Sequence, residues 1–158
     1  MSEVQAIVLG PGEGTAVLRP AGQATTIKAS AEQTGGAFAI LEAVEPVGAA
    51  GPPLHIHHNN EEVFYILEGA LTIRIGEETV TASAGSFVLV PRETRHTFKN
   101  PGTETAKFLI FVSPGGYEGF FVEMAELFKN AGGKPPEFPV IAATAAKYGQ
   151  EFVGPPLP

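Results

Sequence analysis

The sequence predicts an all-β domain with a short C-terminal helical extension. Two observations predict this fold class. Short runs of β-branched and aromatic residues recur at regular spacing up to about residue 113, and turn-forming Gly, Pro and Asn separate them. After Ser113-Pro114 the apolar residues recur instead with the period of an amphipathic helix. We therefore expect a single domain over residues 1–158, with its β core at about 36–113 and helices within about 114–150.

The expected strands follow one another from the N-terminus. Ahead of the core, the candidates are residues 4–9 (VQAIVL), 16–18, 24–30 and 37–45. In the core they are residues 55–58, 63–67, 71–75, 79–82, 86–90, 96–99 and 107–112. Residues 71–75 (LTIRI) alternate apolar and polar side chains, as a strand with one buried face does. Short strands at this spacing indicate an antiparallel sandwich or barrel.

An apolar stripe predicts the first helix of the extension, and its members are Phe120, Phe121, Met124, Leu127 and Phe128. A second helix is expected at about Pro139–Tyr148, where Gly149 stops it. We expect both helices to pack their apolar stripes on the outside of the barrel. In the alternative interpretation, residues 115–121 (GGYEGFF) cover the mouth of the barrel as a lid.

The composition excludes several functional classes. A chain of 158 residues buries a core without cross-links, and the absence of cysteine excludes disulfides and thiolate metal sites. The net charge of −7 argues against a nucleic-acid partner, and the absence of aspartate excludes aspartate-based triads. No apolar stretch approaches the length of a membrane span, and the N-terminus has no signal-peptide pattern, so we expect a cytoplasmic protein.

The four histidines of the chain all lie in two windows, residues 51–69 and residues 85–100. His55 and His57 are two positions apart, so on a strand both side chains leave the same face. A single His-x-His pattern is weak, because histidines also occur on surfaces and in cores. The residues that accompany it strengthen the interpretation.

Residues 58–61 (HNNE) are polar and turn-prone, so we expect a bend there. The bend lets Glu62 begin a new strand and point back towards the two histidines. His96 follows a strand punctuated by Gly and Pro, and we expect it to return from the opposite sheet. Three imidazoles and one carboxylate that converge inside a small barrel predict a metal site.

The two windows resemble the two sequence motifs of the cupin superfamily. In the first window the matching residues are Gly51, slightly displaced, followed by His55, His57, Glu62 and Gly69. In the second they are Gly85, Pro91, His96 and Asn100. The resemblance implies a jelly-roll β-barrel and the metal ligands His55, His57, Glu62 and His96. One position departs from the family pattern: Glu93 stands where cupins usually have glycine, which affects the local turn and not the ligand set.

The remaining polar residues of the windows are expected to have no ligand role. By strand parity His58 points away from His57, as a solvated or outer histidine would. Glu61 faces away from the site for the same reason. Asn100 is expected to close a turn, and Glu68 to be a solvated carboxylate at a strand end.

Three imidazoles and a carboxylate suit one divalent transition metal, and Fe, Mn, Ni, Co, Cu and Zn all accept such ligands. The identity of the metal is not encoded in this pattern. Strand parity places Phe64 and Ile66 on the side of Glu62, and Phe98 on the side of His96. These three residues are expected to line an apolar substrate pocket, although ordinary core packing is the alternative for Phe64 and Phe98. Such a lining favours an apolar or aromatic small-molecule substrate.

The segments SPGGYEGFFVEM (residues 113–124) and KYGQEFVGPP (residues 147–156) extend the resemblance to the quercetinase-like cupins with one cupin domain. That resemblance implies dioxygenolytic cleavage of a flavonol-like or other enolisable aromatic molecule, with Glu62 as the catalytic base. Two alternatives stay open. One is a metal-dependent isomerase or lyase acting on a small polar substrate, and the other is a non-catalytic cupin that binds a small molecule.

A homodimer is also expected, because cupins commonly associate through their N-terminal strands. Residues 4–9 and 24–30 lie outside the two-motif core and would otherwise leave a sheet edge unpaired.

Overall fold

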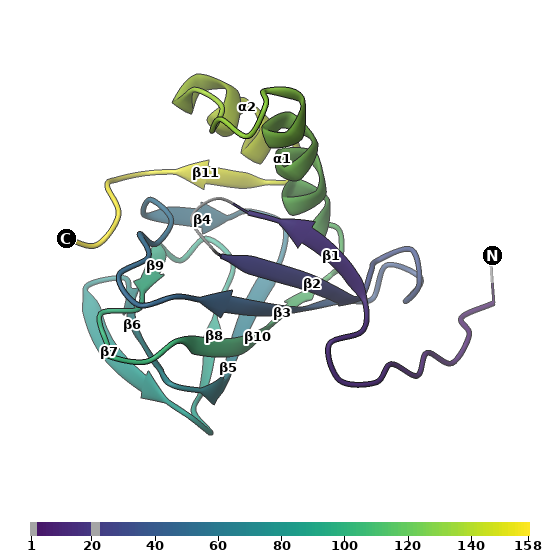
Figure 1. Ribbon diagram of the computed structural model, residues 1–158, viewed down its shortest axis with the longest axis horizontal. Helices are drawn as coiled ribbons and strands as arrows, with labels where there is room; N and C mark the ends of the chain where they lie inside the picture. The colour runs from purple at the N-terminus through teal and green to yellow at the C-terminus, as the bar shows by residue number, and fades with distance from the viewer. Residues whose placement is uncertain (1–2, 20–22) are drawn as a thin grey trace.

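The computed structural model describes residues 3–19 and 23–158, which form two antiparallel sheets and two helices (Figure 1). The first sheet has the strand order β1-β2-β3-β10-β5-β8. Its strands are β1 (Thr15–Leu18), β2 (Ala24–Ala29), β3 (Ala39–Glu45), β10 (Ala106–Ser113), β5 (Glu61–Glu68) and β8 (Phe87–Val90). The second sheet has the order β11-β4-β9-β6-β7. Its strands are β11 (Gln150–Phe152), β4 (His55–His57), β9 (His96–Lys99), β6 (Ala70–Ile75) and β7 (Glu78–Ser83).

The hydrophobic core lies between the two sheets. Buried and partly buried residues alternate along β3 and β10, as they do on strands with one face towards a core. Phe64 and Phe108 of the first sheet and Ile73 of the second are fully buried in one apolar cluster. Burying side chains of this size stabilises the fold by about 2 kcal/mol each, so the apolar face of each strand fixes its register.

The jelly-roll fold class predicted from the sequence is confirmed, but the expected barrel closure is wrong. The described strands form two separate sheets with free outer edges, at β1 and β8 on one sheet and at β11 and β7 on the other. The short strands β8 and β11 end the hydrogen-bonded ladders before the two sheets meet. A site between the sheets is therefore reached from an open end.

The N-terminal segment differs from the prediction. Residues 4–9 form no strand, and Figure 1 shows this segment running away from the two sheets. Val4 is 62% exposed and Val8 is 92% exposed, so the apolar run has no sheet face to cover. The other predicted strands are present within one or two residues of their expected bounds.

The C-terminal extension, residues 114–158, contains α1 (Glu118–Asn130), α2 (Phe138–Lys147) and β11. Both helices were predicted, and β11 was not. Figure 1 shows the helices gathered at one end of the two sheets, beside β11. None of the described helices is long and apolar enough to cross a membrane.

Candidate metal centre

Three histidines meet on neighbouring strands of the second sheet. β4 pairs with β9, and in this register His55 lies directly opposite His96. His57 leaves β4 on the same face as His55, as predicted. All three histidines are buried, at 3% exposed or less.

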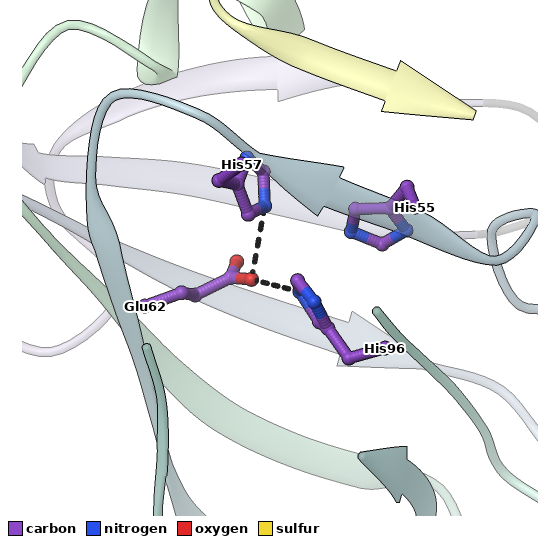
Figure 2. Close-up of side chains that lie close together, drawn as sticks. All are labelled: His55, His57, Glu62 and His96. Atoms are coloured by element: carbon purple, nitrogen blue, oxygen red, sulfur yellow. Dashed lines mark hydrogen bonds and ion pairs between the residues drawn. The ribbon is translucent and has the colours of Figure 1, made fainter. Parts of the chain in front are cut away.

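Glu62 reaches this cluster from the first sheet, where it opposes Val112 of β10 and Val90 of β8. The ligand atoms of the four side chains all lie within 4.8 Å of one another (Figure 2). The structure thus brings together the four residues proposed as ligands, and His96 comes from the sheet opposite that of Glu62. His96 comes from the same sheet as His55 and His57, because β9 is the neighbour of β4, and Glu62 is the residue that crosses between sheets.

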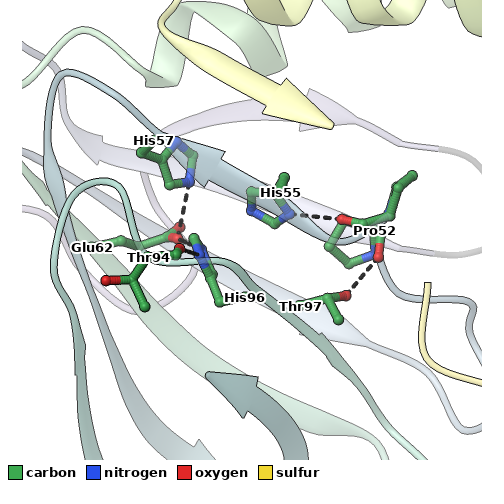
Figure 3. Close-up of polar contacts among 8 residues, drawn as sticks. Pro52, His55, His57, Glu62, Thr94, His96 and Thr97 are labelled. Atoms are coloured by element: carbon green, nitrogen blue, oxygen red, sulfur yellow. Dashed lines mark hydrogen bonds and ion pairs between the residues drawn. The ribbon is translucent and has the colours of Figure 1, made fainter. Parts of the chain in front are cut away.

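Backbone carbonyls fix the orientation of two of the rings. His55 Nδ1–H donates to the carbonyl of Pro53 (2.8 Å), and His96 Nδ1–H donates to the carbonyl of Thr94 (2.9 Å; Figure 3). In the neutral imidazole the other nitrogen, Nε2, then carries a lone pair. Outer hydrogen bonds of this kind are typical of metal-binding histidines, since they set the tautomer and the ring angle.

The close approach of the Glu62 carboxylate to the histidine ring nitrogens favours a shared proton or metal ion between them. Glu62 Oε2 lies 2.7 Å from His96 Nε2 and 3.1 Å from His57 Nε2. A carboxylate oxygen and a ring lone pair repel each other at this separation unless a proton or a metal ion is shared between them. Nδ1 of His57 is buried and has no hydrogen-bond partner within residues 3–19 and 23–158. Three imidazoles and one carboxylate, all buried, fit a first-row divalent metal.

The electrostatics of the site favour the forms that bind a metal. Burial lowers the pKa of His55 to about 3, and the adjacent His96 adds to this effect. His55 is therefore neutral at physiological pH. Burial alone would raise the pKa of Glu62, but His57 and His96 outweigh it and the pKa of Glu62 is lowered, so the group is an anion. A neutral His55 and an ionised Glu62 are the protonation states required of these two groups as ligands.

Two motif glycines are needed because backbones approach closely, at Gly51 beside the strand of His96 and at Gly69 beyond the far end of β5. A Cβ on Gly51 would lie 1.6 Å from the carbonyl oxygen of Phe98, on the strand that carries His96. Gly69 has a φ of +69°, and a Cβ there would lie 2.6 Å from the carbonyl oxygen of Thr105. Both glycines therefore hold the strands of the site at their spacing.

The turn at Glu93 accommodates a glutamate where the cupin motif usually has glycine. Its φ is +65°, the left-handed conformation that favours glycine. Its backbone N–H donates to the carbonyl of His57 (2.9 Å), so this hydrogen bond holds the turn against the end of β4. Its carboxylate accepts a hydrogen bond from His58 (2.8 Å). These contacts offset a backbone cost of about 1 kcal/mol.

The other polar residues of the two windows lie where parity predicted. His58 is exposed and faces away from the cluster, and Glu61 pairs with Arg92 at the surface. The amide of Asn100 is buried and closes a turn, because it donates to the carbonyls of Glu45 and Glu104. Its oxygen accepts from the N–H of Gly102 (3.1 Å). Glu68 is an exposed carboxylate at the end of β5, as expected.

A cavity of about 240 Å³ opens beside the cluster, and both His55 and Glu62 line it. Phe98 also lines it. Phe64 and Ile66 are fully buried and lie outside this lining, where the ring of Phe64 packs 5.5 Å from that of Phe98. Contact of these three residues with a substrate stays a prediction.

One wall of the cavity comes from the C-terminal extension. Its apolar members are Tyr117, Phe120, Phe121, Met124, Phe128, Pro136, Ile141 and Phe152. The expectation that the first helix packs on the outside is therefore wrong for α1, whose stripe faces the cavity that the metal cluster lines. A helical period identifies the apolar face of a helix, but not the surface that this face covers.

Tyr117 and Gln150 are two polar residues of this wall that sequence reasoning did not single out. The ring of Tyr117 packs edge-on against His57, with 4.3 Å between centroids. Burial raises the pKa of Tyr117 well above its usual value, and the Glu62 carboxylate raises it further, so the hydroxyl stays a neutral donor. Gln150 is 3% exposed, and its Oε1 has no partner among the described residues. The segment GGYEGFF was the one signal that pointed to this region.

Comparison with known proteins agrees with the fold. Residues 41–112 match the family model described as "Cupin domain". Quercetin 2,3-dioxygenase from Bacillus subtilis (strain 168) is 30% identical over 123 residues, which cover 78% of this chain and 36% of that protein. The polyketide synthase CurC from Streptomyces cyaneus is 35% identical over 60 residues, which cover 38% of this chain and 39% of that protein.

The matched segment thus spans little more than a third of the length of each of these two curated relatives. Among solved structures, KdgF from Halomonas sp. has a TM-score of 0.63 at 18% identity, covering 73% of this chain and 99% of that one. At this identity the likeness concerns the fold alone. The match over residues 41–112, the similarity to quercetin 2,3-dioxygenase and the two-sheet jelly roll together show that this chain contains a cupin domain.

Proposed function

We propose that this chain is a metal-dependent cupin dioxygenase that acts on a flavonol-like or other enolisable aromatic molecule. One observation carries the proposal: a buried carboxylate, clustered with three imidazoles, lines a cavity whose other walls are mainly apolar and aromatic. Such a cavity suits a flat apolar molecule that presents an oxygen to the metal. The similarity to quercetin 2,3-dioxygenase supports the same reaction class.

His55, His57, Glu62 and His96 would hold one divalent metal. When bound, the metal supplies Lewis-acid stabilisation of a substrate oxyanion, which lowers the pKa of the substrate hydroxyl. Glu62 is the one carboxylate of the cluster and so the base available there. It takes the proton of the substrate hydroxyl and leaves an electron-rich substrate anion that reacts with dioxygen.

The wall from the extension orients the substrate and excludes water. Tyr117 and Phe120 both line the cavity and stack on each other, with 12° between ring planes. Aromatic surfaces prefer offset stacking with other rings, so a planar substrate fits against them. The ring of Tyr117 lies against His57 and lines the cavity, and its neutral hydroxyl is a donor for a substrate oxygen.

Two other functions use the same ligands. An isomerase or lyase for a small polar substrate would need several charged or polar groups around the metal, and the described lining near His55 and Glu62 is dominated by aromatic and aliphatic side chains. A non-catalytic binding cupin would need no base at all. Dioxygen consumption separates the first proposal from both alternatives, and product formation without dioxygen separates the isomerase from the binding protein.

The experiment begins with elemental analysis of the purified protein, followed by oxygen uptake over a set of flavonols and catechols. Glu62→Gln is then compared with wild type at equal bound metal. Glutamine keeps an oxygen that can bind a metal but cannot accept the proton, so we expect turnover per bound metal to fall about 10²–10⁴-fold.

Glu61→Gln is the matched control, since Glu61 is the next residue on β5 and pairs with Arg92 at the surface. Its turnover should equal that of wild type. Equal turnover per metal in Glu62→Gln and wild type would remove the base assignment. Metal-loaded protein that consumes no dioxygen with any of these compounds would remove the dioxygenase itself.

We also propose a homodimer. Residues 4–9 form no strand and β2 is paired on both sides, so the N-terminal edge strand of the first sheet is β1. Leu18 on β1 is 71% exposed, and Val8 of the N-terminal segment is 92% exposed. A second copy that paired with β1 would cover both. Light scattering at micromolar concentration should give twice the mass of the chain, and a monomer mass would overturn this proposal.

A further inference from the structure

The cavity continues from the metal cluster to a second polar group that the cluster does not use. This group consists of Arg19, Gln23 and Glu45, and all three line the same cavity as His55 and Glu62. Glu45 lies at the end of β3 and is 2% exposed. Buried charges are expensive and persist where they are paired or used, so this group needs an explanation.

The two polar groups lie at opposite ends of the inner face of the first sheet. On β10, Val112 is the partner of Glu62 and Ala106 is the partner of Glu45. At the rise of an extended strand these two positions are about 20 Å apart along β10. The cavity therefore has a metal end and a distal end, and the aromatic wall of α1 lies along it.

The hydrogen bonds within the distal group use only one of the five N–H groups of Arg19 among the described residues. Arg19 Nη2 and Gln23 Nε2 each donate to a different oxygen of the Glu45 carboxylate, and Gln23 Nε2 also donates to the carbonyl of Ala50. Nη2 is the one guanidinium nitrogen of Arg19 with a hydrogen-bond partner in residues 3–19 and 23–158, and the side chain is 15% exposed and lines the cavity. The guanidinium is further held over the ring of Phe121, 5.8 Å from its centroid.

The chemistry of this donor selects its partner. An unused N–H requires an acceptor, which for an organic ligand is an oxygen atom. The charges of Arg19 and Glu45 cancel each other, so a ligand anion at this end would be buried without a charge partner of its own. A neutral oxygen, such as that of a phenol, a ketone or a methoxy group, avoids this cost.

We propose that Arg19, positioned by Glu45 and Gln23, forms a subsite that binds a neutral oxygen at the far end of an aromatic ligand. The ligand lies along the α1 wall, and its other end reaches the metal cluster. The inference rests on the proposed function in this last respect only. The subsite would make the protein prefer elongated aromatic molecules with an oxygen substituent remote from the metal-binding oxygen.

The test measures binding of three fluorescent or ultraviolet-absorbing probes to the full chain: naphthalene, 2-naphthol and 2-naphthoate. It compares wild type with the double variant Arg19→Met/Glu45→Met. Both residues are replaced together because removing Arg19 alone would leave Glu45 as a buried unpaired charge, whereas an apolar pair of similar volume is tolerated. The control is Arg95→Met/Glu77→Met, which removes an exposed ion pair remote from the cavity.

We expect wild type and the control to bind 2-naphthol about tenfold more tightly than naphthalene, and to bind 2-naphthoate no better than naphthalene. In Arg19→Met/Glu45→Met the preference for 2-naphthol over naphthalene should fall to about one. Equal binding of 2-naphthol and naphthalene by wild type would overturn the subsite. So would tighter binding of 2-naphthoate, no binding of any probe, or an unchanged preference in the double variant.

These outcomes are independent of oxygen chemistry. A lost preference in the double variant, together with no oxygen uptake on any flavonol, would retain the subsite and remove only the dioxygenase. If the double variant kept the preference for 2-naphthol and oxygen uptake depended on Glu62, the dioxygenase would be retained and the subsite removed.

Discussion

The two-sheet body and the C-terminal extension contribute to one cavity in different ways. The body supplies the four clustered side chains from β4, β5 and β9, and backbone carbonyls and close strand contacts fix them. The extension supplies the aromatic wall from α1 and the strand β11, which pairs with β4 so that Gln150 opposes His57 and Phe152 opposes His55. In this molecule the reactive groups are part of the core, and the surface that a substrate contacts is added from outside it.

This difference between the body and the extension predicts that metal binding depends on the body alone. The largest loss of metal affinity should therefore come from replacing the proposed ligands. Replacing His55, His57 or His96 with alanine should lower metal affinity by more than about 100-fold, because even outer partners of ligands are worth 10–100-fold. The measurement is bound metal per chain by elemental analysis after dialysis. His58→Ala is the matched control, because His58 is adjacent to His57 but lies outside the cluster.

Nearly unchanged metal content is expected for His58→Ala. Equal metal loss in His57→Ala and His58→Ala would show that the strand does not direct alternate residues to opposite sides. The proposal that the strands of the body position the metal ligands would then be wrong.

A second effect should come from the backbone of the body. Gly51→Ala places a Cβ against the carbonyl oxygen of Phe98, which can be relieved only by moving β9. We expect the free energy of unfolding in urea to fall by about 3 kcal/mol. Metal affinity should fall with it, because β9 carries His96. Gly10→Ala is the control, since its nearest contact would be the side chain of Glu13 at 3.4 Å. An unfolding free energy equal to wild type in Gly51→Ala would contradict the close approach.

The body was also the part that the sequence predicted best, for a physical reason. His55, His57 and Glu62 lie close together in the chain, and strand alternation plus one bend decides where they point. That β9 with His96 is the neighbour of β4 was not predicted, because strand order depends on contacts between distant segments. Alternation predicts the face of a residue, but not the neighbour of its strand.

The rest of the cavity depends on distant contacts that leave no local pattern. Gln150–Phe152 has neither an apolar run nor a turn signal, and it is a strand because β4 offers it an unpaired edge. Arg19 and Glu45 are separated by another strand in the sequence, and neither belongs to a motif. Residues 4–9 show the opposite error: the apolar run has strand propensity, but no described strand pairs with it.

Glu118 tests whether the extension can be loosened without affecting the metal. Its buried carboxylate accepts hydrogen bonds from the N–H groups of Ala31 (2.5 Å) and Gly116 (2.7 Å), and so ties the start of α1 to the body. Glu118→Ala leaves both donors without this partner, and we expect a loss of about 2 kcal/mol in unfolding free energy. Binding of 2-naphthol should weaken, while metal content stays at the wild-type level.

Glu126→Ala is the matched control, since Glu126 is an exposed glutamate on the same helix. It should change neither quantity. If Glu118→Ala lost metal to the same extent as His57→Ala, the body and the extension would be one unit rather than two.

The smallest effect concerns His58, which joins the two regions at the surface. One ring nitrogen contacts Glu93 of the body (2.8 Å) and the other contacts Glu151 of β11 (2.8 Å). The hydrogen bond with Glu93, followed by that with Glu151, raises the pKa of His58 above its ordinary value.

A group whose pKa is raised by folding stabilises the folded state fully below its unfolded pKa of about 6.5, and this contribution is lost as pH rises through the folded pKa. The side chain is 39% exposed, so solvent screening reduces the contribution to about 0.5 kcal/mol. We expect wild type to exceed His58→Gln in unfolding free energy by this amount at about pH 5.5 and by almost nothing at about pH 9.5, with bound metal matched in the two proteins. A difference that is constant with pH, or that grows as pH rises, would mean that the bridge between the body and β11 does not depend on the charge of His58.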